Sequence, residues 1–124
     1  MKTILVADDS AIVQNVIEKA LCDEYNVLKA NDGYQTMKII MNNPDGIDGL
    51  LLDLSMPKYD GFAVLEYFKS NNLFKKIPVS IISGDDTKET INKAFKYDIV
   101  DMLNKPFSKS NIKDFVEKMI ISKA

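Results

Sequence analysis

Polar residues follow four apolar runs of the chain, each close to the point where the run ends. They are three carboxylates, a hydroxyl and an ammonium: Asp8, Asp9, Asp53, Ser83 and Lys105. If the runs are neighbouring parallel strands, their carboxyl ends meet at one edge of a sheet, which is where open α/β sheets bind ligands. These residues therefore form a candidate site.

Three carboxylates held close together repel one another unless they share protons or bind a cation. Mg²⁺ prefers oxygen ligands and is usually held by one or two carboxylates while it keeps several waters. We therefore expect Asp8, Asp9 and Asp53 to hold Mg²⁺, for which Mn²⁺ can substitute. A carboxylate can also accept a phosphoryl group when a metal and nearby donors neutralise the incoming charge. Lys105 and Ser83 are suited to supply those contacts.

The elements that must position these residues alternate along the chain. Apolar runs predict strands at residues 3–7, 49–52 and 77–82, with weaker candidates at 26–30 and 99–103. Helical spacing predicts helices at 12–21, 34–41, 62–71, 87–97 and 112–120. Right-handed crossovers in this (βα)5 order favour an α/β fold with a doubly wound, five-stranded parallel sheet.

The same spacing predicts which side chains are buried and where helices begin. The inward residues of the three middle helices are expected to be Met37, Ile40, Met41, Val64, Leu65, Phe68, Ile91, Ala94 and Phe95. Capping or turn signals precede the last four helices at Asp32-Gly33, Asp60-Gly61, Asp86-Thr87 and Ser108. Cys22 lies among apolar helix residues, so we expect a buried, inert thiol in a reducing compartment.

Length and composition predict one packed, soluble domain. The chain has 124 residues, of which 46% are hydrophobic and 27% charged. A formal charge of −2 gives no overall attraction to nucleic acid or to an anionic membrane. The apolar start ends at Asp8, too early for a signal peptide, and no run approaches the ~18 residues of a membrane span. We therefore expect a cytoplasmic protein.

Four motifs carry a family resemblance: VADDS at 6–10, LLDLSMPKYDG at 51–61, SIISG at 80–84 and NKPF at 104–107. In this order and at these distances, the chain resembles the receiver domain of two-component response regulators, in particular single-domain chemotaxis-type regulators. The resemblance covers essentially the whole chain, so residues 1–124 are expected to form one receiver domain. It implies a flavodoxin-like fold with strand order 2-1-3-4-5.

The resemblance also implies roles for the site residues. Asp53 would be the phosphoacceptor, and Asp9 a direct metal ligand together with the main-chain carbonyl of Ser55. Asp8 would hold the metal through water, Ser83 would be the switch hydroxyl, and Lys105 would pair with the phosphate. In such systems the donor is a phosphohistidine of a histidine kinase or a histidine phosphotransfer protein. These 124 residues include no histidine, so the donor would act in trans. Such a domain transfers and slowly loses its own phosphoryl group but is not otherwise an enzyme.

The output expected from the resemblance is a change of the helix 4, strand 5 and helix 5 surface, which then binds a downstream target protein. We leave open whether the chain is a stand-alone regulator or one domain of a longer protein.

Some positions depart from the family pattern. Met102 stands where an aromatic residue usually accompanies movement of the switch hydroxyl. Gly84 replaces a residue that is often alanine, and it would open access to the phosphoryl group. Asp98-Ile99 stands where Gly-Ala is frequent; aspartate can adopt the left-handed conformation there, less easily than glycine, and we treat this as a local variation. Ser55 and Asp85 flank the site and should tune the lifetime of the phosphoryl group. The family also suggests a cis bond before Pro106.

Three alternatives remain. A degenerate receiver would only dock partners. An aspartyl-phosphate phosphatase would usually carry a second aspartate two residues after the nucleophile, where this chain has Ser55. A flavodoxin-like flavin carrier would need a Ser/Thr/Gly-rich phosphate loop after the first strand, where Asp8 and Asp9 would repel the phosphate.

Overall fold

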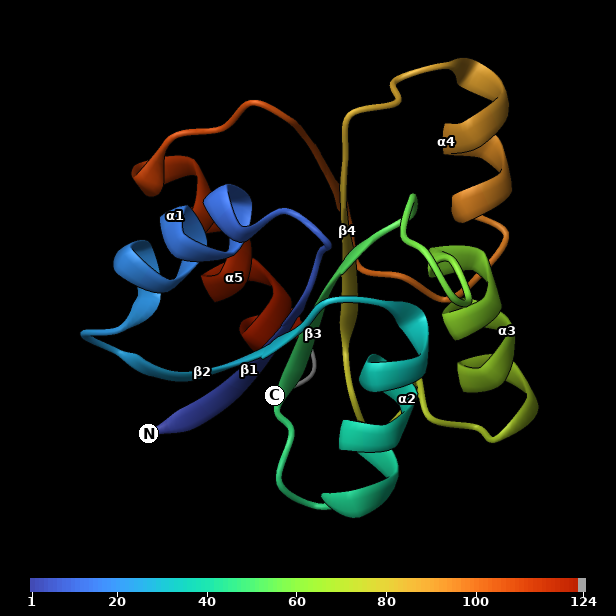
Figure 1. The fold of residues 1–124 in the computed structure, drawn as a ribbon, viewed down its shortest axis with the longest axis horizontal. Helices are drawn as coiled ribbons and strands as arrows, with labels where there is room; N and C mark the ends of the chain where they lie inside the picture. The colour runs from blue at the N-terminus through green and yellow to red at the C-terminus, as the bar shows by residue number, and fades with distance from the viewer. Residues whose placement is uncertain (123–124) are drawn as a thin grey trace.

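Five strands alternate with five helices in the computed structural model, which describes residues 1–122 (Figure 1). The strands are β1 Lys2–Ala7, β2 Tyr25–Ala30, β3 Gly49–Asp53, β4 Val79–Ser83 and β5 Met102–Asn104. The helices are α1 Ala11–Leu21, α2 Gly33–Asn42, α3 Gly61–Ser70, α4 Lys88–Ala94 and α5 Lys109–Ser122. The predicted (βα)5 order is confirmed.

All strand pairs are parallel, and the sheet order is β2-β1-β3-β4-β5. This is the expected flavodoxin-like, doubly wound arrangement. Strand β1 lies between β2 and β3, with Ala7 paired to both Ala30 and Leu52. The strand order therefore reverses at the carboxyl end of β1, which is the switch point where α/β sheets bind ligands.

Helices cover both faces of the sheet, as Figure 1 shows: α1 and α5 pack on one face, and α2, α3 and α4 on the other. Successive strand residues point to opposite faces, so Val6 packs against the α1 and α5 layer while Ala7 faces the other layer. Strands β3 and β4 are buried over their whole length, as their continuous apolar runs predicted.

The helix starts agree with the capping signals. Asp32, Asp60 and Thr87 are N-caps whose side chains accept a hydrogen bond from a backbone N–H three residues later. Ser10 caps α1 in the same way. The Ser108 hydroxyl accepts from Asn111 N at 3.1 Å. These caps fix how the chain turns from each strand end into the following helix.

Three burial predictions were wrong, each near the end of a helix. Met41 is 62% exposed and Phe95 is 50% exposed. Cys22 is an exposed free thiol at the C-cap of α1. Helical periodicity does not show where the layer that packs beneath a helix ends. Residues at the end of the helix that continue the apolar pattern are therefore predicted to be buried although nothing covers them.

Asp98 does not take the left-handed conformation that is accessible to aspartate. Within residues 1–122, the non-glycine residues with positive φ are Lys58, Tyr59 and Asn72. Helix α4 ends at Ala94, earlier than predicted. Its cap Phe95 has a right-handed φ of −74° and donates its N–H to Ile91 O, so no left-handed cap is needed.

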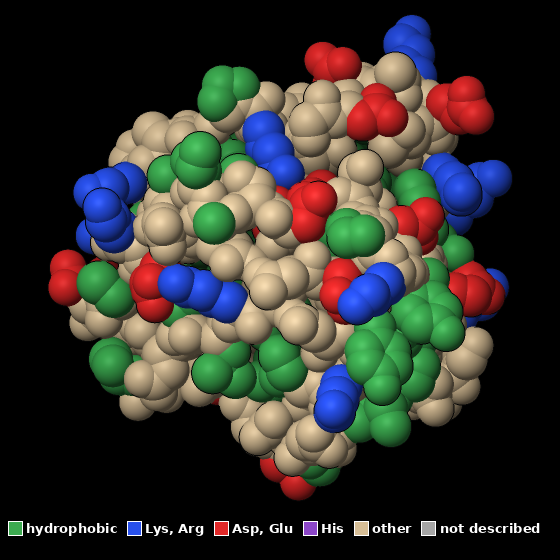
Figure 2. Space-filling model, in the orientation of Figure 1, with side chains coloured by type: hydrophobic (Ala, Val, Ile, Leu, Met, Phe, Trp, Pro, Cys, Tyr) green, Lys and Arg blue, Asp and Glu red, His purple; other side chains and the backbone are tan. Residues whose placement is uncertain are grey.

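The surface carries mixed charge. Figure 2 shows acidic and basic side chains interspersed on one face, while apolar side chains gather over α2 and α3. Tyr34, Met41 and Tyr59 are each more than half exposed. Across residues 1–122, every helix is too short or too polar to span a bilayer.

Candidate functional site

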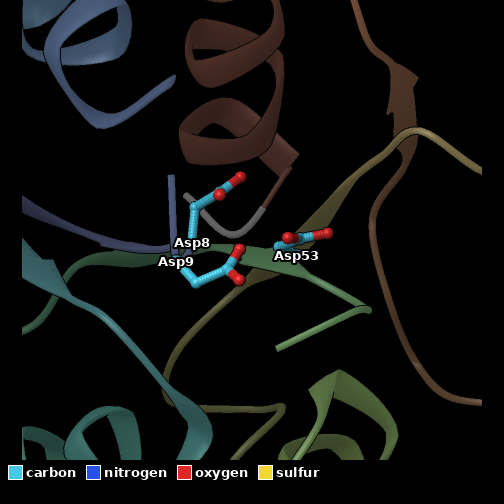
Figure 3. A group of neighbouring side chains, drawn as sticks. All are labelled: Asp8, Asp9 and Asp53. Atoms are coloured by element: carbon cyan, nitrogen blue, oxygen red, sulfur yellow. The ribbon is translucent and has the colours of Figure 1, made fainter. Parts of the chain in front are cut away.

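The sheet brings the predicted site residues to one edge. Asp8 and Asp9 directly follow β1, Asp53 and Ser83 are the last residues of β3 and β4, and Lys105 directly follows β5. One ligand oxygen from each of Asp8, Asp9 and Asp53 lies within 4.8 Å of the other two. Figure 3 shows these three side chains together beyond the ends of β1 and β3. Parallel pairing of β1 with β3 produces this arrangement.

Asp8 is completely buried. Its Oδ1 accepts a hydrogen bond from Ser10 N at 2.8 Å, which fixes the carboxylate at the start of α1. Its Oδ2 forms an ion pair with Lys105 Nζ at 2.7 Å, and no hydrogen bond of regular geometry reaches this oxygen within residues 1–122. Asp8 therefore retains unused acceptor capacity that faces the acidic cluster.

Asp53 is 4% exposed, and its environment disfavours its charge. Burial and then the charge of Asp8 raise the pKa of Asp53, and Lys105 and the Ser55 N–H offset only part of that rise. Lys105 Nζ lies 3.3 Å from Asp53 Oδ2, and Ser55 N lies 3.3 Å from Asp53 Oδ1. One ammonium faces three carboxylates, so the site favours a further cation.

Lys105 reaches into the site from the β5–α5 loop. Burial lowers the pKa of its ammonium, but the close contact with Asp8 and the charges of Asp53 and Asp8 outweigh this effect and raise the pKa overall. The predicted cis bond between Lys105 and Pro106 is confirmed.

The Ser83 hydroxyl is committed to its own loop. Ser83 Oγ accepts from Asp85 N at 3.0 Å and donates to Asp85 O at 3.2 Å. The Asp85 carboxylate in turn accepts from Thr87 N at 2.9 Å and from the Thr90 hydroxyl at 2.8 Å. Ser83, the β4–α4 loop and the start of α4 thus form one hydrogen-bonded unit.

An open cavity of about 730 Å³ lies over these residues. Its lining joins Asp9, Asp53, Ser83 and Lys105. Gly61 packs tightly against the strand end that carries Asp53, because a side chain on Gly61 would meet the backbone of Asp53 and would lie 2.6 Å from Leu54 Cα. The site is therefore accessible from solvent, and the backbone that carries Asp53 is closely packed against the start of α3.

Two residues of this region were missed from sequence. Thr90 lines the cavity and binds Asp85. Gln14 donates to the main-chain oxygen of Asp8 at 2.6 Å. No spacing signal marked Thr90. Gln14 had one available signal, which is that a polar residue occupies the buried face of an otherwise apolar helix.

The donor set fits a hard divalent cation. The three clustered side chains offer only oxygen, Asp8 Oδ2 has unused acceptor capacity, and one side of the cluster is open to solvent. Mg²⁺ requires these properties, since it is bound by few carboxylates and retains several waters. Fold and site together define a flavodoxin-like α/β domain with an acidic cluster at its strand ends whose oxygens are suited to a metal ion.

The chain belongs to the response regulator receiver domain family, whose family model matches residues 4–117. It is 30% identical over 121 residues to the two-component response regulator ARR2 of Arabidopsis thaliana, which covers 97% of this chain and 18% of ARR2. It is 35% identical over 112 residues to the putative response regulator NtrX-like of Rickettsia typhi, covering 88% of this chain and 23% of that protein. The chain thus spans about a fifth of the length of these relatives.

Solved structures agree with the fold. The receiver domain of Francisella response regulator 1452 superposes with a TM-score of 0.87 at 26% identity, covering all of both chains. The chemotaxis response regulator CheY4 of Vibrio cholerae superposes with a TM-score of 0.86 at 21% identity, covering 96% of this chain and 98% of CheY4. The chain is therefore a receiver domain of the two-component signal-transduction type.

Proposed function

We propose that Asp53 accepts a phosphoryl group from a phosphohistidine on a partner protein and that the chain acts as a phosphorylation-dependent switch. The arrangement of Asp8, Asp9 and Asp53 within 4.8 Å of one another, with Lys105 against two of them, carries this proposal. It concentrates a nucleophilic carboxylate and the groups that neutralise phosphoryl charge in one open cavity.

In the transfer step, an Asp53 carboxylate oxygen forms a bond to phosphorus as the phosphorus–nitrogen bond of the donor breaks. The electron pair leaves with the imidazole nitrogen, which takes a proton. The donor lies outside these residues, since the 124-residue sequence has no histidine. Asp53 is a suitable acceptor because its position at the end of β3 faces the open cavity.

Asp9, Asp53 and the main-chain oxygen of Ser55 would hold Mg²⁺ or Mn²⁺ directly, and Asp8 would hold it through water. When bound, the metal supplies positive charge that offsets the phosphoryl oxygens. Lys105 pairs with another phosphoryl oxygen, which draws it from its present contacts with Asp8 and Asp53.

The response begins at Ser83. To donate to a phosphoryl oxygen, its hydroxyl must give up its hydrogen bond to Asp85 O, and the bonds that Asp85 accepts from Thr87 and Thr90 pass that movement to α4. The altered α4–β5–α5 surface then binds a downstream target protein. Met102 is half-buried in β5 and packs against the core without a ring, so the hydrogen-bonded loop carries more of the coupling.

We further propose that residues 1–124 form one receiver unit that works in the cytoplasm. Its chemistry is limited to accepting the phosphoryl group and slowly losing it to water, with Ser55 and Asp85 tuning that loss. No direct contact with nucleic acid is proposed, because the formal charge is −2 and the charges on the face in Figure 2 are mixed.

The test is incubation with Mg²⁺ and acetyl phosphate, followed by intact mass measurement. The wild type should gain one phosphoryl mass, and Asp53→Asn should gain none. Asp60→Asn is the matched control, because Asp60 lines the same cavity but caps α3. It should be phosphorylated like the wild type. A wild type without added mass would overturn the switch and favour a degenerate docking receiver, while equal gain in Asp53→Asn would move the acceptor elsewhere.

A further inference from the structure

Gln14 is a buried polar residue with no part in the chemistry proposed above. It lies in α1, and its side chain is 6% exposed on the face that also buries Ile17, Ala20 and Leu21. Burying an amide stabilises a fold only if the amide is hydrogen-bonded, and an apolar residue would fill the same space without that requirement. The hydrogen bonds of the Gln14 amide therefore indicate the role of this side chain in the structure.

Its Nε2 group contacts three oxygens at the carboxyl ends of β1 and β2. They are Asp8 O at 2.6 Å, Ala30 O at 3.1 Å and Asn31 Oδ1 at 2.9 Å. An amide carries two N–H donors, so at least one of them is shared between acceptors. The two main-chain oxygens can only accept, so the amide nitrogen and not its oxygen must face them.

These bonds hold the peptide between Asp8 and Asp9. The Asp8 backbone is fixed from both sides, because Asp8 N donates to Ala30 O at 3.1 Å while Asp8 O accepts from Gln14. The Asp8 carboxylate has its own restraints in Ser10 N and Lys105. The Asp9 carboxylate is exposed and has no such partner within residues 1–122. Its direction depends on the backbone that Gln14 holds.

We infer that Gln14 is a positioning residue for the metal site: it fixes the Asp8–Asp9 peptide and thereby aims the Asp9 carboxylate at the position that the cation takes beside Asp53. The inference rests on the proposed function, since it assigns a task at the same site. In this role Gln14 contacts neither the metal nor the phosphoryl group and acts through the main chain. Residues that orient metal ligands typically change metal affinity by roughly 10–100-fold when they are replaced.

The test measures metal binding directly, by electron paramagnetic resonance of free Mn²⁺ during titration. Gln14→Met keeps the length and bulk of the side chain and removes both donors. We expect Mn²⁺ affinity to fall by roughly tenfold. Phosphorylation by acetyl phosphate should need correspondingly more Mg²⁺ but should reach the wild-type rate at saturation, because only ligand positioning has been lost.

Ile17→Ala is the matched control. Ile17 lies about one turn further along α1 and is fully buried in the same layer, and its truncation leaves a cavity without removing a hydrogen bond to the β1–α1 turn. It should lower the unfolding temperature while leaving Mn²⁺ affinity unchanged. Equal weakening in Ile17→Ala and Gln14→Met would show general destabilisation and overturn the inference.

A milder variant covers the case in which Gln14→Met does not fold. Asn31→Ala removes one exposed acceptor of the same amide, and it should weaken Mn²⁺ binding in the same direction by a smaller factor. If the wild type binds Mn²⁺ and both variants bind it equally well, Gln14 has no positioning role although the proposed function stands. If the wild type itself binds no Mn²⁺, the proposed metal site fails and the inference fails with it.

Discussion

Ser83 Oγ accepts a hydrogen bond from the backbone N–H of Asp85 at 3.0 Å. The same hydroxyl donates to Asp85 O at 3.2 Å, so its proton is engaged within the β4–α4 loop and is not free to serve Asp53. A phosphoryl group on Asp53 offers a charged acceptor, and hydrogen bonds to charged groups are stronger than those between neutral groups. Switching then requires the exchange of one hydrogen bond for another at Ser83.

This exchange can be followed at the Asp85 amide. Adding beryllofluoride with Mg²⁺, which imitates a phosphoryl group on a carboxylate, should shift the Asp85 amide proton upfield in NMR spectra because its acceptor leaves. Ser83→Ala should abolish that response. Ser80→Ala should retain it, since Ser80 is buried in the same strand and its hydroxyl has no partner within residues 1–122. An unchanged Asp85 amide in the wild type, with beryllofluoride bound, would contradict the exchange.

The pKa of the Asp85 carboxylate should depend on the hydrogen bond that it accepts from the Thr90 hydroxyl. Hydrogen bonds from the Thr87 backbone and then the Thr90 hydroxyl lower the pKa of Asp85 below its usual value. Thr90→Val removes one of these donors, so the pKa of Asp85 should rise, whereas Thr90→Ser should leave it low. Carbon NMR of the carboxyl group during a pH titration measures both. The same pKa in all three proteins would show that Thr90 does not bind Asp85.

Removing Lys105 should lower the stability of the metal-free protein but raise its affinity for Mg²⁺. Lys105→Met leaves the buried Asp8 carboxylate without its countercharge, and the metal-free free energy of unfolding should fall by roughly 1–3 kcal/mol. Mg²⁺ should bind more tightly, because a like charge has left the site. Urea unfolding in EDTA and calorimetric Mg²⁺ titration measure the two effects.

The control for Lys105 is Lys76→Met. Lys76 Nζ lies 2.6 Å from Asp45 Oδ1, and both side chains are exposed. Exposed pairs contribute little, so stability should change by less than about 0.5 kcal/mol and Mg²⁺ affinity should stay constant. Weaker Mg²⁺ binding by Lys105→Met would contradict the electrostatic account.

The backbone at Asp53 leaves no room for a side chain on Gly61. In Gly61→Ala the new methyl group would meet Asp53 O and lie 2.6 Å from Leu54 Cα, and main-chain atoms cannot move aside cheaply. We expect a loss of roughly 1–3 kcal/mol in the free energy of unfolding. Gly84→Ala is the control, because its methyl group would meet nothing within 4 Å. Thermal unfolding compares the two, and equal losses would show that crowding at Asp53 is not the cause.

Tyr97 should titrate well above the ordinary pKa of a tyrosine. Its hydroxyl donates to Glu66 Oε2 at 2.6 Å, and this hydrogen bond, then burial and the charge of Glu66, raise the pKa of Tyr97 to about 12. A raised folded pKa means that the native state keeps a proton that the unfolded chain loses. The pair therefore stabilises the fold fully below pH 10, and its contribution disappears as the pH rises towards 12.

Ultraviolet absorbance at 295 nm checks this assignment. Tyr97→Phe should remove the highest transition, and Glu66→Gln should lower it because the negative charge is gone. Tyr59→Phe, at an exposed tyrosine, should leave that transition in place. Persistence of the highest transition in Tyr97→Phe would assign it to another tyrosine.

Much of the fold and of the candidate site could be predicted from the sequence, because both depend on local patterns. Continuous apolar runs marked β3 and β4, and acids placed directly after strands marked the site, since parallel strands end at one edge. The ends of strands and helices were predicted less accurately. Strand β5 is only Met102–Asn104 and α4 ends at Ala94, because pairing and packing, rather than residue preference, decide where an element ends.

The hydrogen-bond partners of individual side chains could be identified only in the tertiary structure. Nothing in the spacing of Gln14 or Thr90 indicates that one holds the Asp8 carbonyl and the other the Asp85 carboxylate. The exposure of Cys22 and Phe95 also depends on where the neighbouring layer ends. Sequence by itself determined the sheet, the acidic cluster and the family resemblance. Only the folded chain decided which groups restrain that cluster, since such contacts join segments whose separation along the chain carries no periodic signal.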